Sequence, residues 1–430
     1  MKVLIYTHEF PPFAGGAGVY SYDLAVGLAE LGVEVHVATP GPPRRDESVA
    51  WESLIRLPVH YMARWQTEIP WAHYFLLRLY WRHRFDMLLV TERAAQERIA
   101  HLQHPWFRYI TVVHGTEVLD YFEGTKENRP VTSQEMGREY QRADFCIAVS
   151  QATLSLSERL LAGRNIRLAL VQNGIDTGRL GQPDSEKVQY LRAAYGADAE
   201  IIFCLGRLAM DKGHDILLRA FAEVLRVRPR ARLLIGGDGP FAGRLKELRD
   251  ELALGDRVEF LGKIPQDEIP GYFALCDVFA MPSRCERRWE GFGLVYLEAN
   301  FYGKPVVGGN EGGVPEAIAD GESGLVVDSR DAHAVAAAII RILADPELRR
   351  TMGARGQARL FARFTAKRMA EETLQLIRRS ADEPRPFTRM ARAASLIGWS
   401  IAYVLQAASQ RARRLWRAGI GSHTAVESQP

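Results

Sequence analysis

The chain has 430 residues, 47% of them hydrophobic and 25% charged, which predicts a globular protein of two domains and excludes a single ordinary core. Its formal net charge of +3 argues against a chain that binds nucleic acid through overall charge. The four cysteines show neither a CxxC pair nor a histidine spacing suited to zinc, so we expect free thiols in a reducing compartment.

The first half of the chain alternates strand-like and helix-like segments. The N-terminal MKVLIYTHEF has too short an apolar run for a signal peptide and predicts a buried strand over residues 2–7. Residues 19–31 have helical periodicity, and VEVHVAT predicts a second strand. The later apolar runs in DMLLVT, RYITVVHG, FCIAVS and LALVQNG each end in small or polar residues. This alternation predicts a parallel sheet with crossover helices.

The same alternation restarts after a polar connection at about residues 177–187. Further strands are predicted in IIFCLGRL, ARLLIGGDGP, VEFLGKI, DVFAMPS, PVVGG and GLVVD. We therefore predict an α/β protein with two Rossmann-like, doubly wound domains that face each other across a cleft. A membrane-spanning helix needs about 20 consecutive apolar residues. No segment of the sequence provides them, so no such helix is predicted.

A glycine-rich loop, GGAG at Gly15–Gly18, separates the first predicted strand from the first helix. Glycines allow a backbone to approach a ligand, and a helix start favours an anion, although a simple tight turn explains the motif equally well. A dinucleotide-binding motif would need a third glycine at Ser21 and an acid at the end of the second strand. That strand ends in Thr39 and Pro40, which disfavours NAD.

Two cations and a histidine follow predicted strand ends. Arg207 and Lys212 in GRLAMDKG follow the first strand of the second series, at the edge where such sheets bind ligands. Together they suit a diphosphate, with solvated loop cations as the alternative. His114 in VVHGTE is either a cleft residue or a structural polar residue.

The segment CERRWEGFGLVYLEA contains two carboxylates around a predicted helix start. If the helix begins near Gly293, Glu290 precedes it and Glu298 lies in its second turn. The free amides at that start suit a phosphate, while Glu298 could bind a vicinal diol such as a ribose and Glu290 sugar hydroxyls. Alternatively, both acids are solvated helix charges.

These segments together resemble one known family. EGFGLVYLEA is similar to the E-x7-E signature of the retaining glycosyltransferases of family 4, which have the GT-B fold. The other resembling segments occur in the family's order over roughly residues 1–360: PPFAGGAGVY, VVHGTE, AVSQAT, VQNGID, GRLAMDKG, IGGDGP, VEFLGKI, FAMPS and EGGVPEAIADGESGLVV.

The resemblance implies transfer of a hexosyl group from a nucleoside-diphosphate sugar, GDP-mannose or a UDP-hexose, with retention at the anomeric carbon. It implies catalytic roles for Arg207, Lys212, Glu290 and His114. It implies substrate-binding positions at Gly15, Gly16, Gly262, Lys263, Ile264, Gly291, Phe292, Gly293, Leu294 and Glu298.

In these implied roles, Arg207 and Lys212 neutralise the diphosphate leaving group, and the amides after Glu290 hold its distal phosphate. The backbone at 262–264 meets the base, while His114 approaches the sugar. Because cations and helix amides supply the charge stabilisation, we expect no metal and no cofactor. The insert at 285–289 departs from the family pattern and adds a nearby acid, Glu286, but only Glu290 keeps the x7 spacing.

The acceptor side contains two basic, apolar regions. Residues 71–85 combine aromatics with Arg78, Arg82 and Arg84, which predicts either an amphipathic helix at a membrane interface or a core helix with solvated arginines. Residues 384–426 contain seven arginines and neither Asp nor Glu. We expect this extension to contact anionic lipid or to pack on the first domain.

The resulting prediction divides the chain into an acceptor domain over 1–180, a donor domain over 181–360, a helix crossing back over 361–383 and a basic extension over 384–430. We expect a cytoplasmic protein, peripheral on the inner face of the membrane, with a glycan or lipid-linked acceptor and no nucleic-acid partner. The alternatives are a soluble small-molecule acceptor, or a non-catalytic scaffold of the same fold.

Overall fold

The computed structural model describes residues 1–12, 15–41, 56–63, 67, 69–102, 107–124, 130–286 and 288–383. The predictions for the extension over 384–430 lie outside the described residues, as does residue 287 of the insert. None of the described helices combines the length and the apolar composition that a membrane span requires.

The first domain is built on a parallel sheet of seven strands in the order β3-β2-β1-β4-β5-β6-β7. The strands are β1 (Lys2–Tyr6), β2 (Glu34–Pro40), β3 (Val59–Met62), β4 (Met87–Val90), β5 (Tyr109–Val113), β6 (Phe145–Ala148) and β7 (Leu168–Leu170). The connecting helices are α1 (Gly16–Glu30), α3 (Ile69–His83), α4 (Arg93–Ala100), α5 (Thr116–Phe122), α6 (Ser133–Arg142) and α7 (Gln151–Leu160). Helix α1 begins at Gly16, earlier than the predicted 19–31, because the apolar periodicity does not include its glycine-rich first turn.

The second domain repeats this plan with a parallel sheet of six strands in the order β10-β9-β8-β11-β12-β13. The strands are β8 (Glu200–Leu205), β9 (Ala231–Gly236), β10 (Val258–Gly262), β11 (Val278–Met281), β12 (Val306–Gly309) and β13 (Gly324–Val327). The helices are α8 (Ser185–Tyr195), α9 (His214–Val227), α10 (Ala242–Glu251), α11 (Ile269–Leu275), α12 (Leu294–Phe301), α13 (Val314–Ala317) and α14 (Ala332–Ala344). Central strands such as β11 are buried throughout, as expected for a sheet covered by helices on both faces.

The strand order of each sheet reverses at one point, between β1 and β4 in the first sheet and between β8 and β11 in the second. Ligands bind doubly wound sheets at such a switch point, outside the carboxyl ends of the strands. The two predicted Rossmann-like domains are thus confirmed, and their switch points mark where a site belongs.

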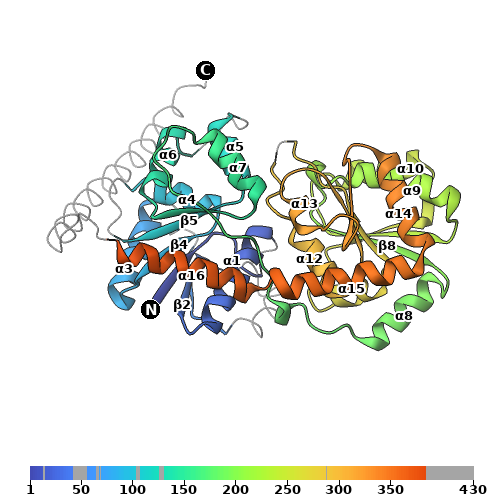
Figure 1. Cartoon of the computed structure of the whole chain (residues 1–430), viewed down its shortest axis with the longest axis horizontal. Coiled ribbons are helices and arrows are strands. Elements are labelled where there is room, and N and C mark those ends of the chain that lie inside the picture. The colour runs from blue at the N-terminus through green and yellow to red at the C-terminus, as the bar shows by residue number, and fades with distance from the viewer. Residues whose placement is uncertain are drawn as a thin grey trace, which may run out of the picture.

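Two helices at the C-terminal end of the described chain join the domains (Figure 1). Helix α15 (Pro346–Arg363) runs along the second domain, and α16 (Ala366–Asp382) crosses to the first, where it lies against α1. A Cβ on Gly27 of α1 would lie 2.4 Å from the carbonyl oxygen of Ala366, so only glycine permits this helix contact. Met369, Ala370 and Leu374 of α16 then complete the core on that face of the first sheet.

Candidate functional site

The second switch point brings together two of the predicted site residues. Lys212 follows β8 and Glu290 follows β11, and the Lys212 Nζ lies 2.5 Å from a Glu290 carboxylate oxygen. The two loops touch because Gly213, at φ +69°, has no side chain: a Cβ there would lie 2.0 Å from the carbonyl oxygen of Pro282. The ion pair therefore stands where a doubly wound sheet receives its ligand.

Arg207 lies in the same loop as Lys212 but is more accessible. Its side chain is 42% exposed, and its guanidinium lies 3.7 Å from the carboxylate of Asp211. At that distance the exposed pair contributes little, so the guanidinium is available to an anionic ligand. Arg207 and Lys212 thus present two cations at one edge of the sheet.

The start of α12 has the features of an anion-binding helix terminus. Gly293 precedes the helix at φ +90° and supplies no side-chain cap for the first amides. The loop before it is fixed from the opposite side, because the Gly313 amide donates to the Glu290 carbonyl oxygen over 2.8 Å. Burial raises the pKa of the neighbouring Cys285 thiol, so this thiol is protonated at neutral pH and is no nucleophile.

Glu298 is oriented by an arginine that the sequence motifs do not identify. The Arg179 guanidinium lies 2.7 Å from Glu298 of α12 and 2.8 Å from Asp23 of α1. Arg179 and Asp23 are buried, so this network joins both domains through the segment that connects them. No sequence motif marks Arg179 as a partner of Glu298. It lies in a polar connection between the domains, where any arginine is expected to be solvated.

In the first domain, the backbone of His114 lies against the Glu290 loop. Its Nε2 lies 2.9 Å from the carbonyl oxygen of Thr91, and its ring meets the edge of Tyr20 with centroids 5.2 Å apart. A Cβ on Gly291 would lie 2.8 Å from the His114 carbonyl oxygen, so the loops of the two domains touch there. The carboxyl edges of the two sheets therefore face each other.

The remaining predicted glycines differ in their surroundings. A Cβ on Gly15 would collide with the Glu9 carboxylate, whereas Gly16 and Gly262 have nothing within 4 Å of that position. Gly262, at φ +68°, ends β10 and is followed by the exposed Lys263. Gly16 and Gly262 thus leave room for a ligand, while the side chain of Ile264 packs toward Gly236.

The insert that departs from the family pattern forms a domain contact. The Trp289 amide donates to Thr116 Oγ1 over 3.0 Å, and its indole Nε1 donates to Thr153 Oγ1 over 3.1 Å. Glu316 of α13 makes a second contact, since its carboxylate accepts from the amides of Gln151 and Ala152 at the start of α7, each over 2.8 Å. These contacts fix the Glu290 loop relative to the first domain.

Replacing Trp289 with alanine is expected to lower the turnover number by about tenfold to a hundredfold, because a displacement of about 1 Å in the catalytic loop carries a cost of this size. The measurement is the initial rate of the sugar transfer that the resemblance implies, at saturating donor. Tyr190→Ala is the control, since Tyr190 is an aromatic of α8 that is 73% exposed. An unchanged rate in Trp289→Ala would show that the insert has no influence on the site.

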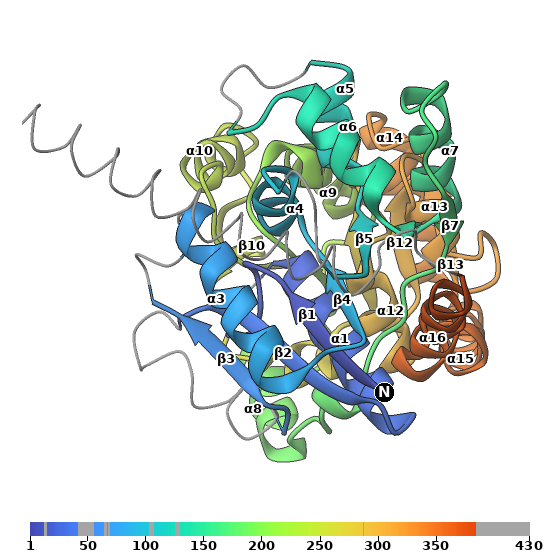
Figure 2. The ribbon, with the colours of Figure 1, turned by 90° about the vertical axis from the view of Figure 1, so that its left-hand side faces the viewer.

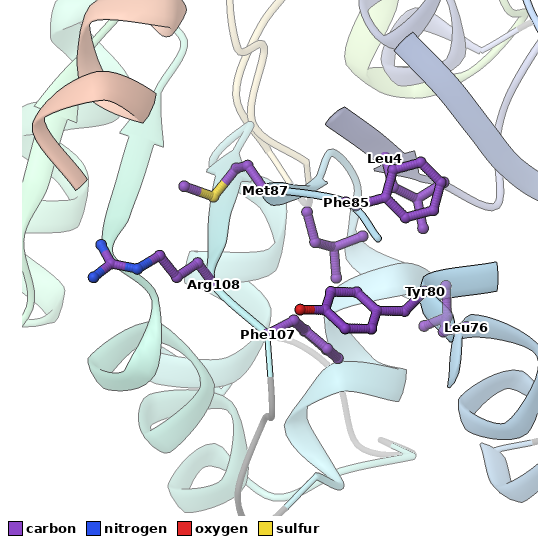
Figure 3. Close-up of a pocket in the computed structure, with 8 residues that line it drawn as sticks. Leu4, Leu76, Tyr80, Phe85, Met87, Phe107 and Arg108 are labelled. Carbon is purple, nitrogen blue, oxygen red and sulfur yellow. The ribbon is translucent and has the colours of Figure 1, made fainter. Parts of the chain in front are cut away.

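A small apolar cavity lies elsewhere, between α3 and the first sheet (Figure 3). Leu76 and Tyr80 of α3 face Leu4 and Phe85 across it, and the Arg108 side chain extends away from them. Its volume of about 20 Å³ is enough for roughly one water molecule and far too small for the nucleotide sugar that the resemblance implies. This cavity is therefore not the implied donor site.

The family of the chain follows from comparison with known proteins. Residues 14–179 match the family described as Glycosyltransferase Family 4, and residues 191–359 match Glycosyl transferases group 1. The chain is 32% identical over 365 residues to a GDP-mannose-dependent alpha-(1-6)-phosphatidylinositol monomannoside mannosyltransferase of Mycolicibacterium smegmatis, covering 83% of this chain and 92% of the relative. It is 28% identical over 380 residues to a D-inositol 3-phosphate glycosyltransferase of Segniliparus rotundus, covering 80% of each.

Solved structures share the fold. Anabaena HepE in complex with UDP and glucose aligns with a TM-score of 0.71 at 22% identity, covering 88% of this chain and all of HepE. Sucrose-phosphate synthase from Thermosynechococcus elongatus aligns with a TM-score of 0.71 at 24% identity, covering 88% of this chain and 98% of the synthase. The chain therefore belongs to glycosyltransferase family 4 and is a retaining, nucleotide-sugar-dependent glycosyltransferase of the GT-B fold.

Proposed function

We propose that this protein transfers mannose from GDP-mannose to a mannosylated phosphatidylinositol or a similar lipid-linked acceptor at a membrane surface. The observation that carries the chemistry is the juxtaposition of Lys212, Glu290 and the start of α12 at the second switch point. The choice of donor and acceptor is supported by the relatives in Mycolicibacterium smegmatis and Corynebacterium glutamicum, whose names specify GDP-mannose and phosphatidylinositol monomannosides.

The proposed mechanism uses charge stabilisation in place of acid catalysis. Arg207 and Lys212 neutralise the diphosphate as it leaves, and the amides at the start of α12 hold its distal phosphate. A diphosphate is a good leaving group without protonation, and one of its oxygens takes the proton of the acceptor hydroxyl on the same face of the sugar. Cations and amides supply the positive charge, so the proposed transfer needs neither a divalent metal nor a cofactor.

Two carboxylates position the donor in this proposal. Glu290 binds hydroxyls of the transferred sugar, and its ion pair with Lys212 keeps the sugar contact beside the leaving diphosphate. Glu298 binds the ribose with one oxygen while Arg179 holds the carboxylate in place. The backbone of Gly262 and of the two residues after it contacts the base of the nucleotide. His114 approaches the sugar from the first domain.

Helix α3 lies on the outside of the first domain (Figure 2), and its exposed side chains support a membrane-bound acceptor. Ala72, Leu76 and Leu79 of this helix are buried against the first domain. The opposite face exposes Tyr74, Arg78, Trp81 and Arg82, which recur at helical spacing. Aromatic and arginine side chains on one face of a helix are typical of an interfacial helix, and Trp81 is 64% exposed.

The double substitution Arg78→Ser with Arg82→Ser is expected to weaken partitioning into anionic vesicles by about 30-fold. Each basic residue near such a surface contributes about 1 kcal/mol, and a tenfold change corresponds to about 1.4 kcal/mol. Vesicle sedimentation measures the effect. The matched control is Arg226→Ser with Arg230→Ser, which removes two exposed arginines from the second domain. Equal partitioning of the two double variants would contradict a membrane contact through α3.

The proposed function is tested by transfer of radiolabelled sugar. The full chain is incubated with labelled GDP-mannose or UDP-glucose, and with either vesicles containing mannosylated phosphatidylinositol or soluble inositol phosphate. Mannose is expected in the lipid, from GDP-mannose alone, with the α-configuration retained in the product by NMR. Label from UDP-glucose only would overturn the donor. Label in inositol phosphate would favour the second candidate, a soluble acceptor, to which the D-inositol 3-phosphate glycosyltransferase relative points.

A further inference from the structure

Three histidines that are far apart in the sequence meet beneath one end of α3. His36 lies on β2, His60 on β3 and His83 at the end of α3, and one ring nitrogen of each lies within 4.8 Å of the others. Strand β3 pairs with β2 so that His60 is opposite Ala38, which places His36, two residues earlier, on the same face. The His36 and His60 rings stack with an interplanar angle of 5°, and the His83 ring centroid lies 4.7 Å from that of His36.

A carboxylate orients the most buried of these imidazoles. Glu34 lies 3.2 Å from the Nε2 of His36, while the Nδ1 of His36 is 2.7 Å from the Nε2 of His60. If the Nε2 of His36 donates its hydrogen to Glu34, its Nδ1 presents a lone pair to the cluster. Metal-binding histidines are held in this way, with the second ring nitrogen donating to a carboxylate.

The chemistry of the cluster favours a metal cation as its ligand. Three imidazole rings lie together, and each offers a ring nitrogen to the same point. Imidazole nitrogen is a common ligand of zinc in proteins.

The geometry also fits the bond lengths of one metal. A tetrahedral zinc ion with Zn–N bonds of about 2.0–2.1 Å requires ligand nitrogens about 3.4 Å apart. The nitrogens here are separated by 2.7 Å for one pair and by at most 4.8 Å overall, so small side-chain rotations suffice. A cavity of about 360 Å³ borders His60 and His83 and gives an ion a path of entry.

We propose that His36, His60 and His83 form a zinc site with a fourth position open to water. His36 and His60 lie toward the amino ends of their strands, whereas the donor site lies at the carboxyl ends of the sheets. The ion therefore takes no part in glycosyl transfer. It joins the edge strand β3 to the end of α3, the helix that bears Arg78 and Trp81, and so makes this part of the first domain rigid.

The site is tested by zinc binding to the full chain after a chelator has removed any bound metal. Binding is measured by isothermal titration calorimetry and by the visible spectrum of the Co²⁺ form. The parent is expected to bind one equivalent of zinc, and His60→Ala and His83→Ala are each expected to bind none. Glu34→Gln is expected to weaken this binding about 10- to 100-fold. The control is His333→Ala, because His333 is an exposed histidine in the second domain that pairs with Glu223 over 2.8 Å.

The thermal midpoint gives a second readout that does not depend on activity. Zinc is expected to raise the midpoint of the parent and of His333→Ala, and to leave that of His60→Ala unchanged. Equal zinc stoichiometry in the parent, His60→Ala and His83→Ala would overturn the proposal. Binding of inorganic phosphate that is lost in His60→Ala, without zinc binding, would overturn it as well and identify an anion site.

Discussion

Substitution of Lys212 by alanine is expected to lower the turnover number by about 10²- to 10³-fold, the effect of removing one fixed charge stabiliser from a preorganised site. In the structure the Lys212 ammonium lies 2.5 Å from Glu290, at the edge of the sheet where the diphosphate is proposed to leave. The charge on the leaving group grows in the transition state, so the loss falls mainly on kcat. Steady-state transfer rates over a range of donor concentrations measure it.

The ion pair between Lys212 and Glu290 provides a second test of this role. Because the two side chains share one interaction, we expect the losses of Lys212→Ala and Glu290→Gln to combine less than additively in the double variant. Arg350→Ala is the control, since Arg350 forms an ion pair with Glu347 over 2.6 Å on the exposed surface of α15. A Lys212→Ala enzyme with near-parental kcat, folded by circular dichroism, would refute the role of Lys212.

Substitution of Arg179 by methionine is expected to give the largest loss of stability, about 3–5 kcal/mol. Its side chain is 3% exposed and pairs with the carboxylates of Asp23 and Glu298, which would be left without a cationic partner at this position. For a domain of this size the loss corresponds to a decrease of about 10 °C in the melting temperature. Differential scanning calorimetry measures the decrease.

A second substitution separates lost charge compensation from lost packing. Asp23→Asn in the Arg179→Met background is expected to recover part of the stability, because it removes one of the two uncompensated carboxylates. Arg350→Met provides the surface control, with a side chain that is 72% exposed. The interpretation fails if Arg179→Met melts within 2 °C of that control, about the change expected for a surface substitution.

Most of the fold could be read from local patterns. Short apolar runs such as those of β5 and β11 predict parallel strands because a buried strand must be apolar on both faces, and the structure has them as predicted. Arg207 and Lys212 were placed correctly at the end of β8, since the position of a residue after a strand fixes the edge of the sheet at which it lies. The family resemblance is likewise confirmed by the relatives.

The partners of the site residues could not be read in this way. Glu290 and Glu298 were predicted as two ligands around one helix start, but their contacts with Lys212 and Arg179 join residues 78 and 119 positions apart. Trp289 was described only as part of an insert, although its indole bonds to α7 of the other domain. The predicted substrate roles of these residues stay predictions.

Local patterns in the sequence were enough to predict the fold, the family and the residues that follow each strand, because strand periodicity and turn chemistry are local properties of the chain. Which of those residues meet depends on how the elements pack in three dimensions. The histidine spacing indicated no zinc site, yet the pairing of β2 with β3 and the packing of α3 bring His36, His60 and His83 together. Contacts of this kind depend on strand register and helix packing across distant segments, and no local pattern encodes them.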